Sequence, residues 1–216
     1  MGQFIVIGLG NFGYNVATSL FELRNQVLAI DSNSKKIEQI KDKVTQAVVA
    51  NVKDKEALSE FLSSDVDAAI VSLGDKLEAS ILTTLYLRDL GIKKIIVKAI
   101  NDDHGQILRL IGATEVIYPE KEEATRLAQR LTTPNLIEHI PLASEYSIME
   151  MAVPDKFAGK SLKELQLRSK YKVEVIAIKD VLHDTLQLIP GADVKIKPDN
   201  VLIVIGKKPD INKLKV

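Results

Sequence analysis

The sequence of 216 residues contains no cysteine. This absence excludes disulfide bonds, thiolate metal sites, iron–sulfur clusters and cysteine nucleophiles, and it is consistent with a cytosolic protein. Histidine is almost as scarce, because only His104, His139 and His183 occur and they lie far apart in the sequence. The sequence therefore offers few candidates for an imidazole metal ligand or a histidine general base.

Net charge and long apolar runs are also lacking. Lys and Arg total 29 residues and balance 29 Asp and Glu residues, so no net field draws the chain to nucleic acid or to an anionic membrane. The longest apolar runs, such as residues 201–205, are far shorter than the ~20 residues that span a membrane. The N-terminal residues lack a basic segment and lead directly into a predicted strand. We therefore expect a cytoplasmic protein without nucleic-acid partners.

The first 130 or so residues show short apolar runs that alternate with amphipathic segments, the pattern of a parallel sheet with helices on both faces. Several runs are rich in Val and Ile without alternation, as is typical of strands buried on both faces. The predicted strands are residues 4–7, 27–30, 47–49, 68–71, 95–98 and 116–118. The sequence therefore predicts an α/β fold with a doubly wound parallel sheet.

A different pattern begins after residue 132. Residues 119–131 open with proline, carry acidic residues early and basic residues late, and are predicted to form a helix. Three further strands, separated by Pro-containing turn signals, are predicted at residues 146–153, 173–179 and 201–205. We place a boundary after residue 134, so that domain 1–134 precedes a small α+β domain 135–216. The core of the second domain is small, which favours docking or dimerisation.

The strongest functional signal is the stretch Gly8-Leu-Gly10-Asn-Phe-Gly13, between the first predicted strand and the first helix. Gly8 allows the tight turn, Gly10 lets the backbone approach a pyrophosphate, and Gly13 permits close helix–strand contact. Asp31 ends the second strand, where a carboxylate accepts hydrogen bonds from an adenosine ribose. The pattern predicts a Rossmann-type nucleotide site, and the charge of Asp31 opposes the 2′-phosphate of NADP. A glycine-rich turn that binds nothing is the alternative.

Other strand ends should line the same crevice, because ligands of open parallel sheets bind beyond the carboxyl ends of the strands. For Lys98 and Glu120 the alternatives are a solvated charge and an ordinary first-turn helix residue, and for Ser72 a buried hydroxyl bonded to backbone. The predicted nucleotide-binding residues are Gly8, Gly10, Asn11, Phe12, Gly13, Asp31, Ser32, Asn51, Val52, Ser72, Leu73, Gly74, Lys98 and Glu120.

No catalytic constellation accompanies this crevice in the sequence. A nucleophile elbow, a cluster of metal ligands and a P-loop are all missing from it, and His104 stands at a predicted helix start, where capping or surface roles are more common than catalysis. The sequence therefore favours a nucleotide-binding switch that is not an enzyme. A small NAD-dependent oxidoreductase or NAD(H) redox sensor is the alternative function.

From end to end, the chain resembles the KtrA/TrkA family, the regulatory subunits of Ktr/Trk potassium uptake systems, which have an RCK (KTN) N-domain and a small RCK C-domain. The resemblance implies rings of paired RCK domains, typically octameric, beneath a separate K⁺-conducting membrane subunit that holds them at the inner face of the membrane. It also implies that ATP, ADP, NAD or NADH at the Rossmann crevice changes the ring and controls gating. The residues that carry it are 6–13, 27–31, 49–51, 71–74, 79–84, 97–99, 111–113, 118–121, 145–148 and 202–206.

Several positions either match or depart from the residues that bind ligands in this family. Ktr-type members often carry Arg after the second glycine to contact the ATP γ-phosphate, whereas this chain has Asn11, so we do not expect strong discrimination of ATP from ADP. Glu120 matches a family carboxylate that lies near the phosphates and a divalent ion, Mg²⁺ or Ca²⁺, shared between paired subunits. Arg168 matches the arginine of an Asp-x-Arg pattern that binds cyclic di-AMP in the family C-domain. Gln166 stands in place of the Asp, and Glu174 replaces a later Asn and would repel a phosphodiester, so we do not expect cyclic di-AMP to bind.

Overall fold

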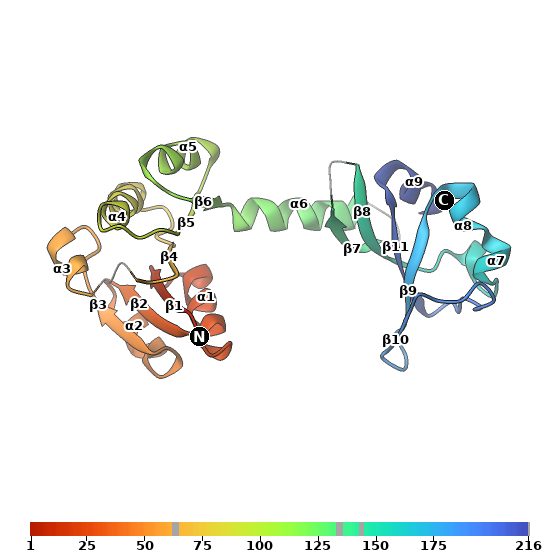
Figure 1. Cartoon of the computed structure of the whole chain (residues 1–216), viewed down its shortest axis with the longest axis horizontal. Coiled ribbons are helices and arrows are strands. Elements are labelled where there is room, and N and C mark those ends of the chain that lie inside the picture. Colours follow the sequence, from red (N-terminus) through yellow and green to blue (C-terminus); the bar gives the residue numbers. More distant parts are fainter. Residues whose placement is uncertain (62–64, 133–135, 143–144, 216) are drawn as a thin grey trace. The chain divides into compact units, whose positions relative to one another are not determined.

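The computed structural model describes residues 1–61, 65–132, 136–142 and 145–215. The chain divides into two compact units, unit 1 (Met1–Glu120) and unit 2 (Lys121–Val216) (Figure 1). The predicted domain boundary falls at residues 133–135, outside the described residues, and it stays a prediction. None of the helices in the described ranges has both the length and the apolar character that crossing a membrane requires.

Unit 1 is built on a parallel six-stranded sheet in the order β3-β2-β1-β4-β5-β6 (Figure 1). All six predicted strands are confirmed to within one residue at each end. They are β1 (Gln3–Ile7), β2 (Gln26–Asp31), β3 (Gln46–Val49), β4 (Ala68–Val71), β5 (Ile95–Lys98) and β6 (Glu115–Ile117). The strand order reverses between β1 and β4, so a crevice opens at their carboxyl ends.

Helices cover both faces of this sheet, as successive side chains of β1 illustrate. Ile5 and Ile7 pack with residues of α3, α4 and α5, whereas Val6 packs with residues of α1 and α2. These helices are α1 (Asn11–Glu22), α2 (Ser34–Ile40), α3 (Lys55–Ser59), α4 (Leu77–Asp89) and α5 (Asp102–Ile111). Apolar residues on both strand faces therefore give two cores, and the predicted Rossmann-like α/β architecture is confirmed.

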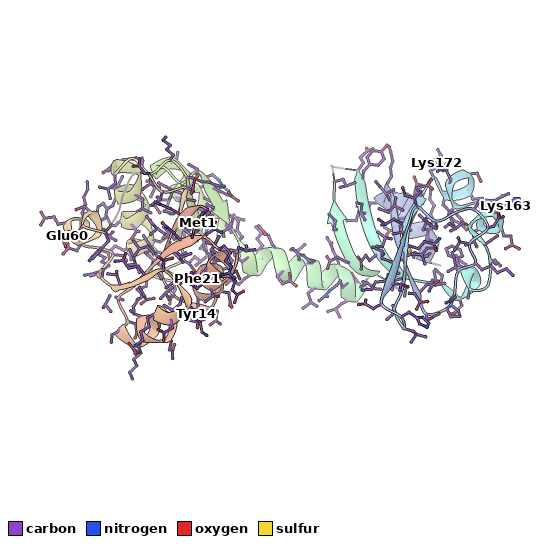
Figure 2. The ribbon with its side chains drawn as sticks, turned by 60° about the horizontal axis from the view of Figure 1, so that its bottom comes forward. Met1, Tyr14, Phe21, Glu60, Lys163 and Lys172 are labelled. Atoms are coloured by element: carbon purple, nitrogen blue, oxygen red, sulfur yellow. The ribbon has the colours of Figure 1, made fainter. Side chains whose placement is uncertain are left out.

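Unit 2 contains a five-stranded antiparallel sheet in the order β10-β9-β11-β8-β7. The side chains of β8 alternate between buried and partly exposed, and Met149 and Met151 pack with residues of the three short helices. The strands are β7 (Leu136–Pro141), β8 (Tyr146–Ala152), β9 (Glu174–Asp180), β10 (Thr185–Leu188) and β11 (Asn200–Lys207); the helices are α7 (Leu162–Leu165), α8 (Leu167–Tyr171) and α9 (Lys208–Asn212). The side chains of each unit gather around its own sheet (Figure 2).

The predicted α+β class of the second unit is confirmed, and so are its three predicted strands. The predicted helix at residues 119–131 is α6 (Pro119–Thr132). The sequence pattern did not reveal β7 or β10. All four residues of β10 are exposed, so burial imposes no apolar pattern on that strand, and among the described strands its one partner is β9.

Candidate functional site

The turn between β1 and α1 shows why two of its glycines are needed for folding. Gly8 has φ +92°, and a Cβ there would lie 2.2 Å from the backbone oxygen of Ser72. A Cβ on Gly13 would lie 2.0 Å from the backbone oxygen of Gly8. A side chain at either position would therefore force the backbone to shift, because the turn, β4 and the start of α1 are in direct contact.

Gly10 differs, because a Cβ at this position would meet no described atom within 4 Å. Gly10 caps α1, whose first turn reads Asn-Phe-Gly-Tyr and brings no acidic side chain to the helix start. The first N–H groups of a helix have no intrahelical acceptor, and the helix dipole makes this end attractive to anions. The open space at Gly10 thus lies where a phosphate group fits the backbone donors.

The carboxylate of Asp31 lies at the end of β2 and is 7% exposed. Its Oδ2 accepts a hydrogen bond of 2.7 Å from the Leu9 N–H, and its Oδ1 accepts one of 2.8 Å from the Asn33 N–H. The Lys36 Nζ lies 3.4 Å from Oδ2. These contacts fix the orientation of the carboxylate, which retains acceptor capacity on Oδ1 for a ribose hydroxyl.

A pocket of about 290 Å³ opens at the carboxyl ends of β1, β2, β3 and β4. Because these strands are parallel, residues far apart in the sequence meet at one edge of the sheet. The predicted residues that line it are Gly8, Gly10, Asp31, Ser32, Asn51, Val52, Ser72, Leu73 and Gly74. A concave site with a few convergent polar groups is the usual form of a small-molecule site.

Five predicted residues do not line this pocket, although all of them are described. Asn11 is exposed at the start of α1, and Gly13 is buried beneath the turn. Phe12, Lys98 and Glu120 form a separate cluster. The Lys98 Nζ lies 5.9 Å from the centre of the Phe12 ring and pairs with the Glu120 carboxylate. The hydrogen bond from Lys98 lowers the pKa of the Glu120 carboxyl below its ordinary value.

Several pocket residues had not been predicted, namely Lys36, Lys53, Asp75, Lys76 and Ala79. Asp75 and Lys76 directly follow the predicted Ser72-Leu-Gly74, so extending that strand-end argument by two residues would have found them. Lys53 likewise directly follows the predicted Asn51 and Val52, so the same extension would have found it. Lys36 reaches the pocket from α2, and no local pattern in the sequence marks it.

The described residues do not themselves form a metal site, since no three His, Asp or Glu side chains among them gather closely enough to hold an ion. Glu120 has Lys98 as its partner instead. A divalent ion at Glu120 would need further oxygen ligands, such as the phosphates of a nucleotide.

None of the described histidine rings lines the pocket at the β1–α1 turn. His104 is 3% exposed, so its ring is buried rather than on the surface, and its Nδ1 accepts a 3.4 Å hydrogen bond from the Ile100 N–H. His183 lies beside Asp180, with its Nδ1 2.9 Å from the carboxylate. The side chain of His139 lies outside the described part of the structure.

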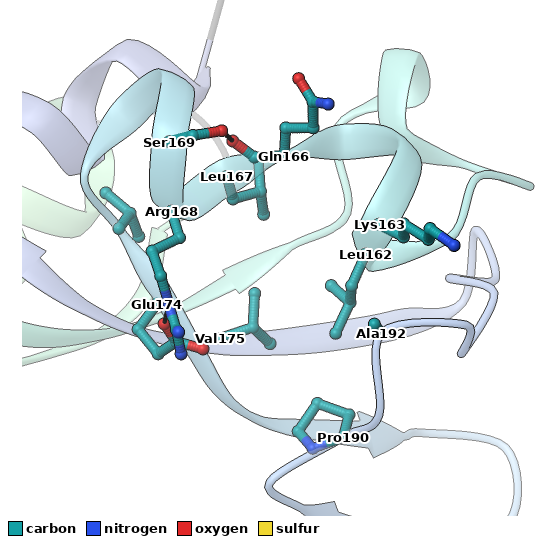
Figure 3. A pocket seen from close by; sticks show the side chains of 11 residues that line it. Leu162, Lys163, Gln166, Leu167, Arg168, Ser169, Glu174, Val175, Pro190 and Ala192 are labelled. Carbon is teal, nitrogen blue, oxygen red and sulfur yellow. Dashed lines mark hydrogen bonds and ion pairs between the residues drawn. The ribbon is translucent and has the colours of Figure 1, made fainter.

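Unit 2 has a pocket of its own, of about 570 Å³, which contains Arg168 (Figure 3). The Arg168 guanidinium pairs with the carboxylate of Glu174, and Figure 3 shows the two side chains together at one end of the pocket. Apolar residues, including Leu162, Leu167 and Val175, form much of the remaining lining. The arginine that matches the cyclic di-AMP ligand of the family thus already has an anionic partner within the chain.

Residues 4–119 match the TrkA-N domain family, and residues 148–215 match the TrkA-C domain family. The Ktr system potassium uptake protein A of Bacillus subtilis (strain 168) is 37% identical over 211 residues, which are 98% of this chain and 94% of that protein. The Ktr system potassium uptake protein A of Vibrio alginolyticus is 33% identical over 214 residues, 99% of this chain and 96% of that protein.

Among solved structures, the GsuK RCK domain is similar with a TM-score of 0.69 at 20% identity, over 99% of this chain and 47% of that chain. The GsuK channel bound to NAD is similar with a TM-score of 0.64 at 20% identity, over 99% of this chain and 38% of that chain. This chain therefore spans less than half of these neighbours, and at such low identity the similarity shows that the fold is that of RCK domains. Together with the matched domains and relatives, it shows that the chain belongs to the KtrA/TrkA family of the Ktr and Trk potassium uptake systems.

Proposed function

We propose that this chain is the cytosolic nucleotide-binding regulatory subunit of a potassium channel or transporter. In this role it controls K⁺ transport because nucleotide binding changes the conformation of an assembly of RCK domains. The observation that carries the proposal is the pocket at the β1–α1 turn, where open space at Gly10, the free helix start and the oriented Asp31 carboxylate lie together. Membership of the KtrA/TrkA family indicates that the process regulated by this site is potassium transport.

The ligand that fits this pocket is an adenine nucleotide, of the ATP/ADP or NAD/NADH class. Asp31 would hold the ribose, and the N–H groups at the start of α1 would hold the phosphates. The volume of about 290 Å³ is at the lower end of the range for small-molecule sites, so it suits the adenosine part of the ligand. The family neighbour GsuK has NAD bound, which supports the dinucleotide as one ligand.

Gating rather than catalysis is the proposed outcome of binding. The described pocket lining includes no histidine, tyrosine or glutamate. Of its aspartate and lysine side chains, Asp31 is engaged by two backbone N–H groups, Lys36 contacts Asp31, and Lys53 pairs with Glu78. Regulation needs only a difference in nucleotide affinity between two conformations. The alternative, an NAD-dependent oxidoreductase, requires turnover of a second substrate.

The partners that we propose are further copies of this chain and a separate K⁺-conducting membrane subunit. Paired RCK domains would assemble into a ring, with an octamer as the expected count, and the membrane subunit would hold the ring at the cytoplasmic face. A Mg²⁺ or Ca²⁺ ion between Glu120 and nucleotide phosphates belongs to this proposal, since the carboxylate alone supplies too few ligands. Light scattering of the purified chain tests the assembly, and a stable monomer of about 24 kDa would contradict the ring.

Calorimetric titration of the full chain with ATP, ADP, NAD⁺ and NADH tests the site. We expect binding of at least one of these nucleotides, and we expect Asp31→Ala to weaken it about tenfold to a hundredfold because charge-assisted hydrogen bonds are lost. Thermal unfolding of the variant serves as the control, since Asp31 also holds the N–H groups of Leu9 and Asn33. Unchanged affinity would contradict the ribose assignment. Potassium flux through the reconstituted complex would then test regulation, and turnover of NADH with a second substrate would favour the oxidoreductase instead.

A further inference from the structure

The ribose end of the pocket contains a cation that the sequence pattern did not indicate. Lys36 extends from α2 to the carboxylate of Asp31, with its Nζ 3.4 Å from Oδ2, and it lines the pocket beside Ser32. Its side chain is 41% exposed and forms part of the pocket lining. An ammonium has three donors, and the contact with Asp31 uses one of them.

This contact changes the charge that a ligand meets at the ribose. Asp31 by itself would repel a phosphate on the ribose 2′ position, which is why the sequence disfavours NADP. Lys36 offsets that charge, and its flexible four-carbon stem can turn the ammonium from Oδ2 toward a bound phosphate. Both oxygens of Asp31 keep a backbone N–H partner when Lys36 moves, so the carboxylate itself stays in place.

The rest of the pocket lining carries charges of both signs. Lys36, Lys53 and Lys76 line the pocket together with Asp31 and Asp75. Lys53 pairs with Glu78, whereas Lys36 contacts Asp31, the residue predicted to bind the ribose. A dianionic group beside Asp31 therefore meets a compensating cation.

We propose that Lys36 determines selection at the ribose 2′ position and lets this pocket bind 2′-phosphorylated adenine dinucleotides, the NADP class, as well as NAD. The proposal rests on the proposed function, because it assumes that Asp31 faces an adenosine ribose. It makes Lys36, rather than Asp31, the residue that decides between the two classes.

The chain offers a matched control in Lys35, the preceding residue of α2. Lys35 is exposed, does not line the pocket, and contributes only its backbone N–H to the Asn33 cap within the described contacts. Substitution of either lysine by methionine removes one charge from the same short helix and keeps a side chain of similar length. Any change that appears only in the Lys36 variant therefore comes from the pocket.

The test is calorimetric titration of the full chain with NAD⁺ and with NADP⁺ at fixed ionic strength. We expect wild type to bind NADP⁺ within about tenfold of NAD⁺, and Lys36→Met to weaken NADP⁺ binding about tenfold while NAD⁺ binding changes by about threefold or less. Lys36→Arg should restore NADP⁺ binding, and Lys35→Met should match wild type.

A NAD⁺-to-NADP⁺ affinity ratio that is the same in Lys36→Met as in wild type would overturn the assignment to Lys36. Rejection of NADP⁺ by wild type at about a hundredfold or more relative to NAD⁺ would overturn it as well. Wild type that binds neither dinucleotide nor ATP or ADP would overturn the proposed function and this inference with it. Binding with an unchanged ratio would overturn the inference alone.

Discussion

Lys98, the last residue of β5, forms an ion pair with Glu120 in the first turn of α6. The Lys98 side chain is 14% exposed and its ammonium lies near the ring of Phe12 at the start of α1, whereas Glu120 is 71% exposed. The ammonium near the start of α1 is therefore already paired with a carboxylate that is itself accessible. We therefore expect a phosphate that binds at the start of α1 to compete with Glu120 for Lys98.

Glu120→Gln should release Lys98 from this competition. We expect ATP binding without divalent ions to become up to about fivefold tighter, because an exposed ion pair contributes at most ~1 kcal/mol. The enhancement of ATP binding by Mg²⁺ should become smaller, since the carboxylate that would bind the ion is gone. Calorimetry with and without Mg²⁺ measures both effects. Glu122→Gln on the same helix is the control, and equal behaviour of the two variants would leave Glu120 with no role beyond its helix.

Alanine at the three glycines of the β1–α1 turn should separate folding from binding. Gly8→Ala and Gly13→Ala would place a Cβ 2.2 Å and 2.0 Å from backbone oxygens, and we expect the melting temperature to fall by about 5 °C or more. Gly10→Ala enters open space, so its melting temperature should stay near that of wild type while nucleotide affinity falls about tenfold or more. Calorimetry and thermal unfolding of the three variants check this. Wild-type nucleotide affinity in Gly10→Ala would show that phosphates do not approach this backbone.

The Arg168–Glu174 pair should control anion binding in the pocket of unit 2. We expect weak binding of cyclic di-AMP by wild type, and about tenfold tighter binding by Glu174→Gln, because the guanidinium becomes available to a phosphodiester. Glu145→Gln is the matched control, since Glu145 pairs with Lys207 and does not line this pocket. If titration gives the same affinity for wild type and Glu174→Gln, the carboxylate does not mask Arg168.

His104 should make the stability of the chain depend on pH. Burial lowers the pKa of the His104 imidazole below its ordinary value, and Nε2 finds no hydrogen-bond partner among the described residues. The unfolded chain therefore binds a proton more readily than the folded chain. Stability is full above the ordinary histidine pKa of about 6.5 and decreases as the pH falls through and below that value.

Chemical denaturation of wild type and His104→Gln between about pH 7.5 and 5 measures this effect. The variant should lose less stability than wild type over that interval, because it has no buried imidazole to protonate. His183→Gln removes an exposed histidine and serves as the control. Equal pH dependence of wild type and His104→Gln would show that protonation of His104 does not contribute.

Much of unit 1 was predictable because its signals are local. Runs of Val and Ile marked all six strands, and the Gly8-Leu-Gly10-Asn-Phe-Gly13 turn marked the start of α1. The order of parallel strands then brought Asp31, Asn51 and Ser72 to the pocket where strand-end reasoning had placed them. Strand β10 went unpredicted because an exposed edge strand carries no burial pattern.

The sequence by itself determined the two fold classes, the nucleotide turn and the strand-end residues, because these depend on periodicity and on the conformations that short segments adopt. Only the tertiary structure decided that Lys36 contacts Asp31, that Lys98 pairs with Glu120 and that Glu174 forms an ion pair with Arg168. These pairs join charges on separate elements or turns, and long side chains reach partners that depend on how helices and strands pack. No spacing along the chain fixes that packing. The charge pairs at both pockets therefore could not be predicted from the sequence.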